Sequence, residues 1–250
     1  MGAAKINSLR TEFLGFPVDN ISSNELMDFA NKVIKEGTYH FIGVLNANKM
    51  YLASRNANVG VSMESASIIL PENAINMGMR ILKRPLKQRN MGGIHTMEEF
   101  LKLADLRNYS VYFLGTKNDI LEKLVEKVSS VFPGIRILGF RDGFFDEVEE
   151  RMIVNEIGNI SPNFLFVGMG SPKQEIFITK YLNELRSNIC LGVGGSLNVI
   201  AGIEKPAPKW TKFGLEWLFR SFQDPRKFKR YLVINTYFVW KFVSYFFKRK

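Results

Sequence analysis

The chain has 250 residues, a formal net charge of +10 and one cysteine. This length is sufficient for a substantial core in one large or two modest domains, and the composition is that of an ordinary globular protein. A single cysteine excludes a disulfide framework and a cysteine-based metal site, and it indicates a reducing compartment. The N-terminal residues lack the apolar stretch of a signal peptide.

Short apolar runs alternate with helical patterns through the first 203 residues. The first helix is predicted at Ser23–Glu36, where a Ser-x-x-Leu start gives no capping box. Buried strands are predicted at 39–45, 67–70, 110–114, 135–138, 163–167 and 188–193. Further helices are predicted at 47–56, 97–106, 117–132, 146–157 and 173–185. Strands that are apolar on both faces and alternate with helices are typical of a parallel α/β sheet.

The carboxyl ends of such strands are where an α/β sheet binds its ligands. Two predicted strands end in polar side chains, and three end in glycines that precede a helix. These residues are Asn46, Glu72 and Asn73, Gly115, Gly168 and Gly170, and Gly194 and Gly195. Glycine turns leave backbone N–H groups exposed at the positive end of a helix dipole. Several such turns at one edge of the sheet predict an anion-binding site.

The turn at 166–175 reads FVGMGSPKQE, and two interpretations fit it. In the first, Ser171 is the N-cap of a helix, Pro172 is its first residue and Gln174 completes a capping box. In the second, the same turn holds a phosphate. The glycine spacing matches neither Gly-x-Gly-x-x-Gly nor a P-loop, so the turn alone does not decide between them.

The last 47 residues differ sharply from the rest. Residues 204–250 hold twelve Lys and Arg against three acidic residues, so they carry nine of the ten net charges, and they hold all three tryptophans. The apolar stretch 231–247 would be about 25 Å long as a helix, against about 30 Å of bilayer hydrocarbon, and Lys241 interrupts it. A helix lying in the membrane interface fits better than a spanning helix or an ordinary core-packed one. Interleaved aromatic residues also disfavour a nucleic-acid partner.

Six motifs follow one another in a characteristic order. They are LPE at 70–72, PLKQR at 85–89, GMGSPKQE at 168–175, GVGGS at 192–196, APKW at 207–210 and GLEWLFR at 214–220. This series resembles the WecG/TagA/CpsF glycosyltransferases from about residue 14 to residue 230, and its most specific parts are GSPKQE and GLEWL. The resemblance implies a Rossmann-like core at 1–203 and a helical, membrane-associating appendage at 204–250.

The resemblance also implies an activity. It is the inverting, metal-independent transfer of a sugar such as N-acetylmannosamine from a UDP-sugar donor. The implied acceptor is a sugar on undecaprenyl diphosphate at the cytoplasmic face of the bacterial membrane, in the synthesis of a cell-surface polysaccharide or teichoic acid. The appendage would contact the membrane and close over the active site, and a dimeric or trimeric homo-oligomer would compete with that closure.

No metal or cofactor is expected. His40 and His95 have no metal-ligand spacing. Asp-x-Asp, the commonest motif for holding a metal against a nucleotide-sugar diphosphate, does not occur in the chain. The stretch RDGFFD at 141–146 is predicted to be a turn and helix cap rather than a site.

Individual roles follow from the resemblance. Glu72 is predicted to take the acceptor proton, and Arg89 and Arg220 to neutralise the departing UDP. Gln174 is expected to contact the nucleotide sugar. Arg226 and Arg230 are further candidates for neutralising UDP, but a role as surface or headgroup-binding charges explains them equally well. The predicted substrate-binding residues are Asn46, Asn73, Gly168, Gly170, Ser171, Gln174, Gly194, Gly195, Asn198, Arg226 and Arg230.

Three polar positions depart from the family's pattern. The family's Leu-Pro-Asp-Gly is Leu-Pro-Glu72-Asn73 here, so the expected base is one methylene longer. Val44 replaces a threonine and Asn198 replaces an aspartate, and the stretch 72–89 is one residue shorter than usual. Two hypotheses follow. The donor or acceptor sugar has changed, or catalysis is weak and the chain binds a UDP-sugar or lipid-linked glycan in a membrane assembly complex.

Overall fold

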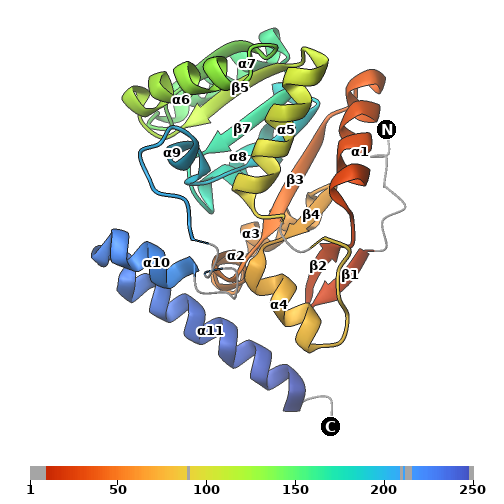
Figure 1. The fold of residues 1–250 in the computed structure, drawn as a ribbon, viewed down its shortest axis with the longest axis vertical. Helices are drawn as coiled ribbons and strands as arrows, with labels where there is room; N and C mark the ends of the chain where they lie inside the picture. The colour runs from red at the N-terminus through yellow and green to blue at the C-terminus, as the bar shows by residue number, and fades with distance from the viewer. Residues whose placement is uncertain (1–9, 89–90, 209–210, 212–215, 248–250) are drawn as a thin grey trace.

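In the computed structural model, which describes residues 10–88, 91–208, 211 and 216–247, a six-stranded sheet forms the centre of the fold (Figure 1). Its order is β4-β3-β8-β7-β5-β6, and every neighbouring pair is parallel. The strands are β3 (His40–Leu45), β4 (Ile68–Pro71), β5 (Ser110–Gly115), β6 (Arg136–Arg141), β7 (Phe164–Gly168) and β8 (Ile189–Gly192). All six lie where apolar runs predict strands, so the predicted α/β class is confirmed.

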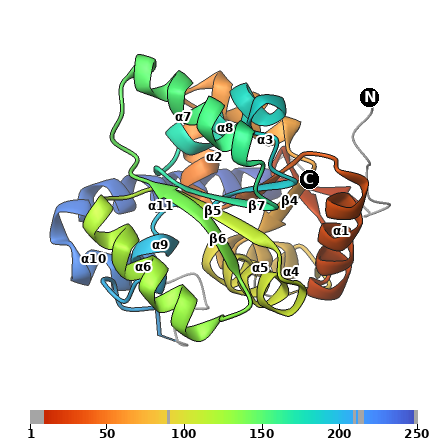
Figure 2. The same ribbon diagram turned by 90° about the horizontal axis from the view of Figure 1, so that it is seen from above.

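Helices cover both faces of this sheet (Figure 2). Successive side chains of a strand point to opposite faces. Phe164 and Phe166 therefore belong to one buried layer, whereas Leu165 and Val167 belong to the other. The first layer is closed by α1 (Ser23–Glu36), α5 (Gly93–Arg107), α6 (Asn118–Val131) and α9 (Ser196–Ile200). The second is closed by α2 (Ala47–Ala53), α3 (Ala57–Ser65), α7 (Glu147–Ile160) and α8 (Lys173–Leu185).

Two helix starts test the capping predictions. Helix α1 does have a capping box. Ser22 Oγ accepts the Glu25 N–H at 3.3 Å, and the Glu25 carboxylate accepts the Ser22 N–H at 2.8 Å. The prediction for this helix is wrong because its cap is Ser22, one residue before Ser23. The prediction for RDGFFD is confirmed, since Asp146 caps α7 in a capping box with Glu149.

An N-terminal hairpin of β1 (Arg10–Phe13) and β2 (Phe16–Asp19) lies beside β4. The Asp19 carboxylate accepts the Ile69 N–H at 2.7 Å and pairs with Arg10 at 2.8 Å. These contacts fix the hairpin against the sheet. Phe13 is fully buried there and packs against the short helix α4 (Asn73–Ile81) and the C-terminal helix.

The appendage contains α10 (Glu216–Gln223), a 3₁₀ turn at Pro225–Lys227 and α11 (Phe228–Phe247). Helix α11 lies across the lower side of the molecule in Figure 1, and the rings of Phe238 and Phe242 lie 6.1 Å from that of Phe13. No described helix is long and apolar enough to cross a bilayer. The outer face of α11 exposes Leu232, Val239, Trp240, Val243, Phe246 and Phe247.

Candidate active site

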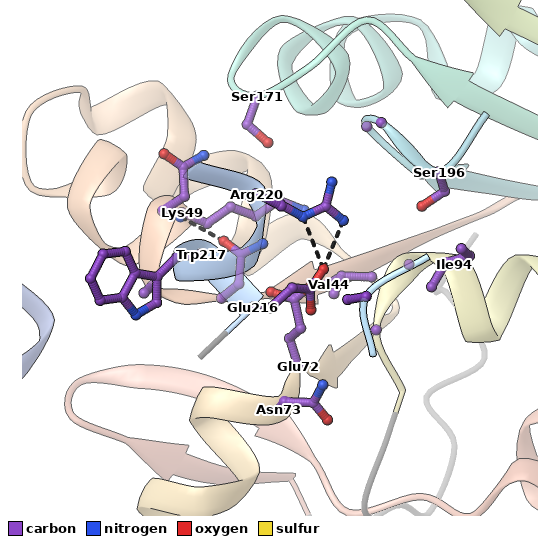
Figure 3. Close-up of a pocket in the computed structure, with 18 of the residues that line it drawn as sticks. Val44, Lys49, Glu72, Asn73, Ile94, Ser171, Ser196, Glu216, Trp217 and Arg220 are labelled. Atoms are coloured by element: carbon purple, nitrogen blue, oxygen red, sulfur yellow. Dashed lines mark hydrogen bonds and ion pairs between the residues drawn. The ribbon is translucent and has the colours of Figure 1, made fainter. Parts of the chain in front are cut away.

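A cavity of about 480 Å³ opens at the carboxyl ends of β3, β4 and β8. One wall belongs to the core and comes from strand ends and from the starts of α2, α4, α5 and α8. The other wall belongs to α10 and α11. Figure 3 shows Glu72 from the core and Arg220 from α10 approaching the same space. Most of the predicted site residues line this cavity: Asn46, Glu72, Asn73, Gly170, Ser171, Gln174, Gly194, Gly195, Arg220 and Arg230.

Four of the predicted site residues stand apart from this group. Arg89 lies outside the described residues. Gly168 faces the packing between β7 and α9, where an added Cβ would lie 2.4 Å from the Leu197 side chain. Arg226 has a 92% exposed side chain, which pairs with Asp224 at 3.0 Å. Neither Gly168 nor Arg226 lines the cavity.

Asn198 also lies beside the cavity rather than in its wall. Its amide oxygen accepts the Thr116 hydroxyl at 2.7 Å, and its amide nitrogen donates to Glu204 at 3.2 Å. Glu204 in turn lies 3.6 Å from Arg220. Asn198 thus connects the turn after β5 to the arginine of the appendage.

The positive ends of four helices converge on the cavity. Asn46 is the N-cap of helix α2, and its side chain accepts the Lys49 N–H at 2.9 Å. Helices α4, α5 and α8 begin at residues 73, 93 and 173, and the first turn of each lines the cavity. Partial positive charge at such ends favours an anionic ligand. This arrangement fits the anion-binding site that the strand ends predict.

The side chains of the Gly-Ser-Pro turn do not form the predicted capping box. Helix α8 has Pro172 at its N-cap and no side-chain cap bond. The Ser171 hydroxyl donates instead to Glu175 at 3.0 Å. The Gln174 amide donates to Glu175 at 2.7 Å and accepts the Gly194 N–H at 3.0 Å. Ser171 lies one residue too early to cap the helix. Gln174 ties the two glycine turns together through Gly194, whereas Ser171 bonds to Glu175 within its own turn.

A buried ion pair lies behind this turn. Lys49 Nζ is 2.9 Å from Glu175 Oε1, and the two side chains are 3% and 0% exposed. Burial acts to raise the pKa of Glu175, but the Lys49 charge and hydrogen bonds outweigh it, so that pKa is lowered. The positive charge of Lys49 is therefore balanced within the protein.

Glu72 lies between β4 and α4 as the N-cap residue of α4, with its side chain directed into the cavity (Figure 3). Burial, followed by the negative charge of Glu216, raises the pKa of Glu72 to about 7. Arg220, Lys49 and a hydrogen bond from Asn46 oppose this rise. Near neutral pH a substantial fraction of this carboxyl is ionised and able to accept a proton.

Arg220 is held by two carboxylates of the appendage. Its Nε and Nη2 atoms donate to Glu216 Oε1 at 3.0 and 2.7 Å, and Glu204 lies 3.6 Å from Nη1. The guanidinium group is thereby fixed over the core wall, across from Glu72 (Figure 3). One cavity thus holds a carboxyl that titrates near pH 7 and a guanidinium that stays charged.

Sequence reasoning missed several residues of the cavity. Residues 92–95 were not predicted, although a Gly-Gly pair before a helical pattern was a usable signal. A second group, Tyr231, Ile234 and Asn235, comes from α11, whose composition indicates a membrane surface rather than a cavity wall. Lys49 gave no signal, because a lysine in a short helix is usually exposed. The missed lining residues include Lys49, Gly92, Gly93, Ile94, His95, Tyr231, Ile234 and Asn235.

Residues 11–250 match the Glycosyl transferase WecG/TagA/CpsF family. The chain therefore belongs to this family of glycosyltransferases, which confirms the resemblance. It is similar to proteins named N-acetylglucosaminyldiphosphoundecaprenol N-acetyl-beta-D-mannosaminyltransferase. The Bacillus spizizenii (strain W23) protein is 32% identical over 199 residues, 79% of this chain and 76% of the relative. The Bacillus subtilis (strain 168) protein is 29% identical over 233 residues, 92% and 90% of the two chains.

Proposed function

We propose that this protein transfers N-acetylmannosamine or a related hexose from a UDP-sugar to a sugar linked to undecaprenyl diphosphate, with inversion and without a metal ion. The names of the relatives support the sugar and the acceptor. The observation that carries the proposal is a single cavity holding Glu72, whose pKa is raised to about 7, and Arg220.

In the proposed reaction the acceptor hydroxyl attacks the anomeric carbon of the donor. Glu72 takes the hydroxyl proton as the new glycosidic bond forms. The bond from the anomeric carbon to the diphosphate oxygen breaks, and UDP leaves with the electron pair. A single displacement on the face opposite the leaving group inverts the anomeric centre. A base with a pKa of about 7 suits this step at neutral pH.

The departing UDP needs positive charge around it. We propose that Arg220 and the N-terminal turns of α2, α4, α5 and α8 supply it. Arg230, which lines the cavity from α11, is a further candidate, and Arg89 keeps the role that the sequence predicts for it.

Several other predicted residues act indirectly in this proposal. Both ends of the Gln174 amide bond to protein atoms, so Gln174 holds the glycine turns in place rather than gripping the sugar. Gly168 allows close packing, and Asn198 orients Glu204 and, through it, Arg220. Arg226 faces outward and is available to lipid headgroups.

The proposal includes attachment to the cytoplasmic face of the membrane through the appendage, 204–250. The outer face of α11 exposes Trp240 by 63% and Phe247 by 76%, and basic residues crowd the start of this helix. Apolar and aromatic side chains beside Lys and Arg are the pattern of a helix lying in the interface of an anionic leaflet. A lipid-linked acceptor would reach the cavity from that side.

A transfer assay tests this function. The full chain is incubated with radiolabelled UDP-N-acetylmannosamine, or with other UDP-sugars, and a short-chain lipid acceptor, with and without EDTA. We expect one inverted glycosidic product, formed at the same rate in EDTA. No turnover with any donor, together with measurable UDP binding, would instead identify a binding relative without catalysis.

A further inference from the structure

A second patch of exposed apolar and basic residues lies on the core. Met77 and Ile81 of α4 are 37% and 53% exposed. Arg80, Lys83 and Arg84 are exposed around them. We call these five residues the α4 patch. The face combines large apolar side chains with long cationic ones, as interfacial helices do.

The positive charge of this patch is not balanced locally. Residues 73–88 contain four Lys and Arg and no Asp or Glu, although residues 1–203 as a whole carry only one net positive charge. Among ion pairs of the described residues, this segment contributes Lys87 alone, which pairs with Glu25 at 2.6 Å. The α4 patch is therefore a local concentration of cations that suits an anionic surface.

The α4 patch adjoins the exposed face of α11. A Cβ at Gly78 would lie 3.2 Å from the ring of Phe242, so this α11 side chain reaches α4 at the glycine. Ile81 is three residues after Gly78 and lies on the same side of α4. On α11, Phe246 is one turn after Phe242, and its side chain is 46% exposed. The apolar face of α11 thus continues onto the core.

We propose that the α4 patch is a second membrane contact, which binds an anionic bilayer together with α11. The inference rests on the proposed function, in which the acceptor is held in a membrane. It adds that the core itself, and not the appendage alone, contacts the leaflet. Helix α4 begins immediately after Glu72 and is about 13 Å long. Binding at the α4 patch would therefore hold the proposed base at a fixed place near the headgroups that carry the acceptor.

The apolar part of the α4 patch is tested in the full chain by the double variant Met77→Ser/Ile81→Ser. A matched control is Val148→Ser/Met152→Ser, because these residues also form an exposed i, i+4 pair, 72% and 66% exposed. They lie on α7, at the far end of the molecule from α11 (Figure 1). Co-sedimentation with vesicles of phosphatidylcholine and phosphatidylglycerol measures the membrane affinity.

The cationic part is tested by Arg80→Gln/Arg84→Gln, with Lys123→Gln/Lys127→Gln on α6 as the control of equal charge. Each cation near an anionic leaflet contributes about five-fold to binding, so loss of Arg80 and Arg84 should weaken vesicle affinity by roughly 25-fold. The control should change it little. The difference should disappear with vesicles of phosphatidylcholine alone.

Turnover of a water-soluble acceptor is measured for every variant in the same experiment. We expect all four variants to keep the rate of the unchanged chain, since none of them alters a cavity residue. Equal vesicle affinity of the patch variants and their controls would overturn the proposal. If a patch variant leaves vesicle affinity unchanged but alters the sedimentation coefficient of the lipid-free protein, the proposal is overturned, and the patch is instead a contact between copies of this chain. Absence of turnover in the unchanged chain would contradict the proposed function. The vesicle measurements would still test the membrane contact, because they do not depend on turnover.

Discussion

The core wall of the cavity is assembled from strand ends and helix starts, whereas the opposite wall consists of two surface helices. Behind the core wall, Lys49 and Glu175 form a buried ion pair that also receives hydrogen bonds. In α10 and α11, by contrast, Ser221 and Ile234 are the buried residues. These two helices contact the core through aromatic rings, such as those of Phe238 and Phe242 on Phe13, rather than through a core of their own. The core wall is therefore preformed, and the second wall depends on docking.

The largest effect is expected at the core wall. Glu72→Gln removes the proposed base and keeps the shape of the side chain, so it should lower kcat by about 10²–10⁴. Affinity for UDP should stay nearly unchanged, because no diphosphate contact is assigned to Glu72. Steady-state transfer kinetics and UDP titration measure the two quantities. Retention of most activity would assign proton removal to another group.

This variant carries an internal control for folding. The pKa of Glu72 is raised from 4.5 to about 7, so ionisation of this carboxyl destabilises the fold as the pH rises through that interval. Glutamine has no such ionisation. At pH 8 the variant should therefore unfold at a temperature no lower than that of the unchanged chain. A loss of activity with unchanged stability then reports on the chemistry.

A second prediction tests whether the core wall is preformed. Lys49→Met would leave Glu175 charged and unpaired in a buried place, and loss of one partner of such a pair costs about 3–5 kcal/mol. The double variant Lys49→Met/Glu175→Gln removes both charges and keeps an acceptor for Ser171 and Gln174. Urea unfolding should show that the double variant recovers most of the lost stability. Equal losses in both variants would mean that the pair does not organise this wall.

A smaller effect is expected from the appendage wall. The negative charge of Glu216 raises the pKa of Glu72. Glu216→Gln should therefore lower this pKa, and the rise of kcat/KM with pH should occur at lower pH. Loss of Glu216 also removes an ion-pair partner of Arg220. The positive charge of Arg220 lowers the pKa of Glu72, so this second effect has the same direction as the first. A pH profile of kcat/KM measures the shift. An unchanged or higher midpoint would contradict coupling across the two walls.

The core wall could be predicted from the sequence better than the appendage wall. Runs such as 164–167 are apolar on both faces, and that local pattern alone predicts a buried parallel strand. The carboxyl ends of parallel strands meet at one edge, so Asn46, Glu72 and Gly194 could be grouped without coordinates. The sequence also predicts the contrast in charge between residues 1–203 and 204–250.

Side-chain direction could not be predicted in the same way. Ser171 and Gln174 have the spacing of a capping box, but the helix begins one residue later than that pattern requires. Asn198 follows a glycine turn, yet its side chain bonds to Thr116 and Glu204 beside the cavity. Such outcomes depend on contacts between residues far apart in the sequence. The role of α11 as a cavity wall depends on the same kind of long-range packing.

Arg220 and Arg226 lie on the same appendage, and a comparison of the two tests most directly whether the appendage takes part in the reaction. Arg220 lines the cavity, whereas the Arg226 side chain is 92% exposed and outside it. With a water-soluble acceptor, Arg220→Ala should lower kcat by about 10²–10³, the usual effect of removing a group that stabilises developing charge. Arg226→Ala should stay within about two-fold of the unchanged chain. Equal, near-full activity of both variants would mean that the appendage only anchors the protein.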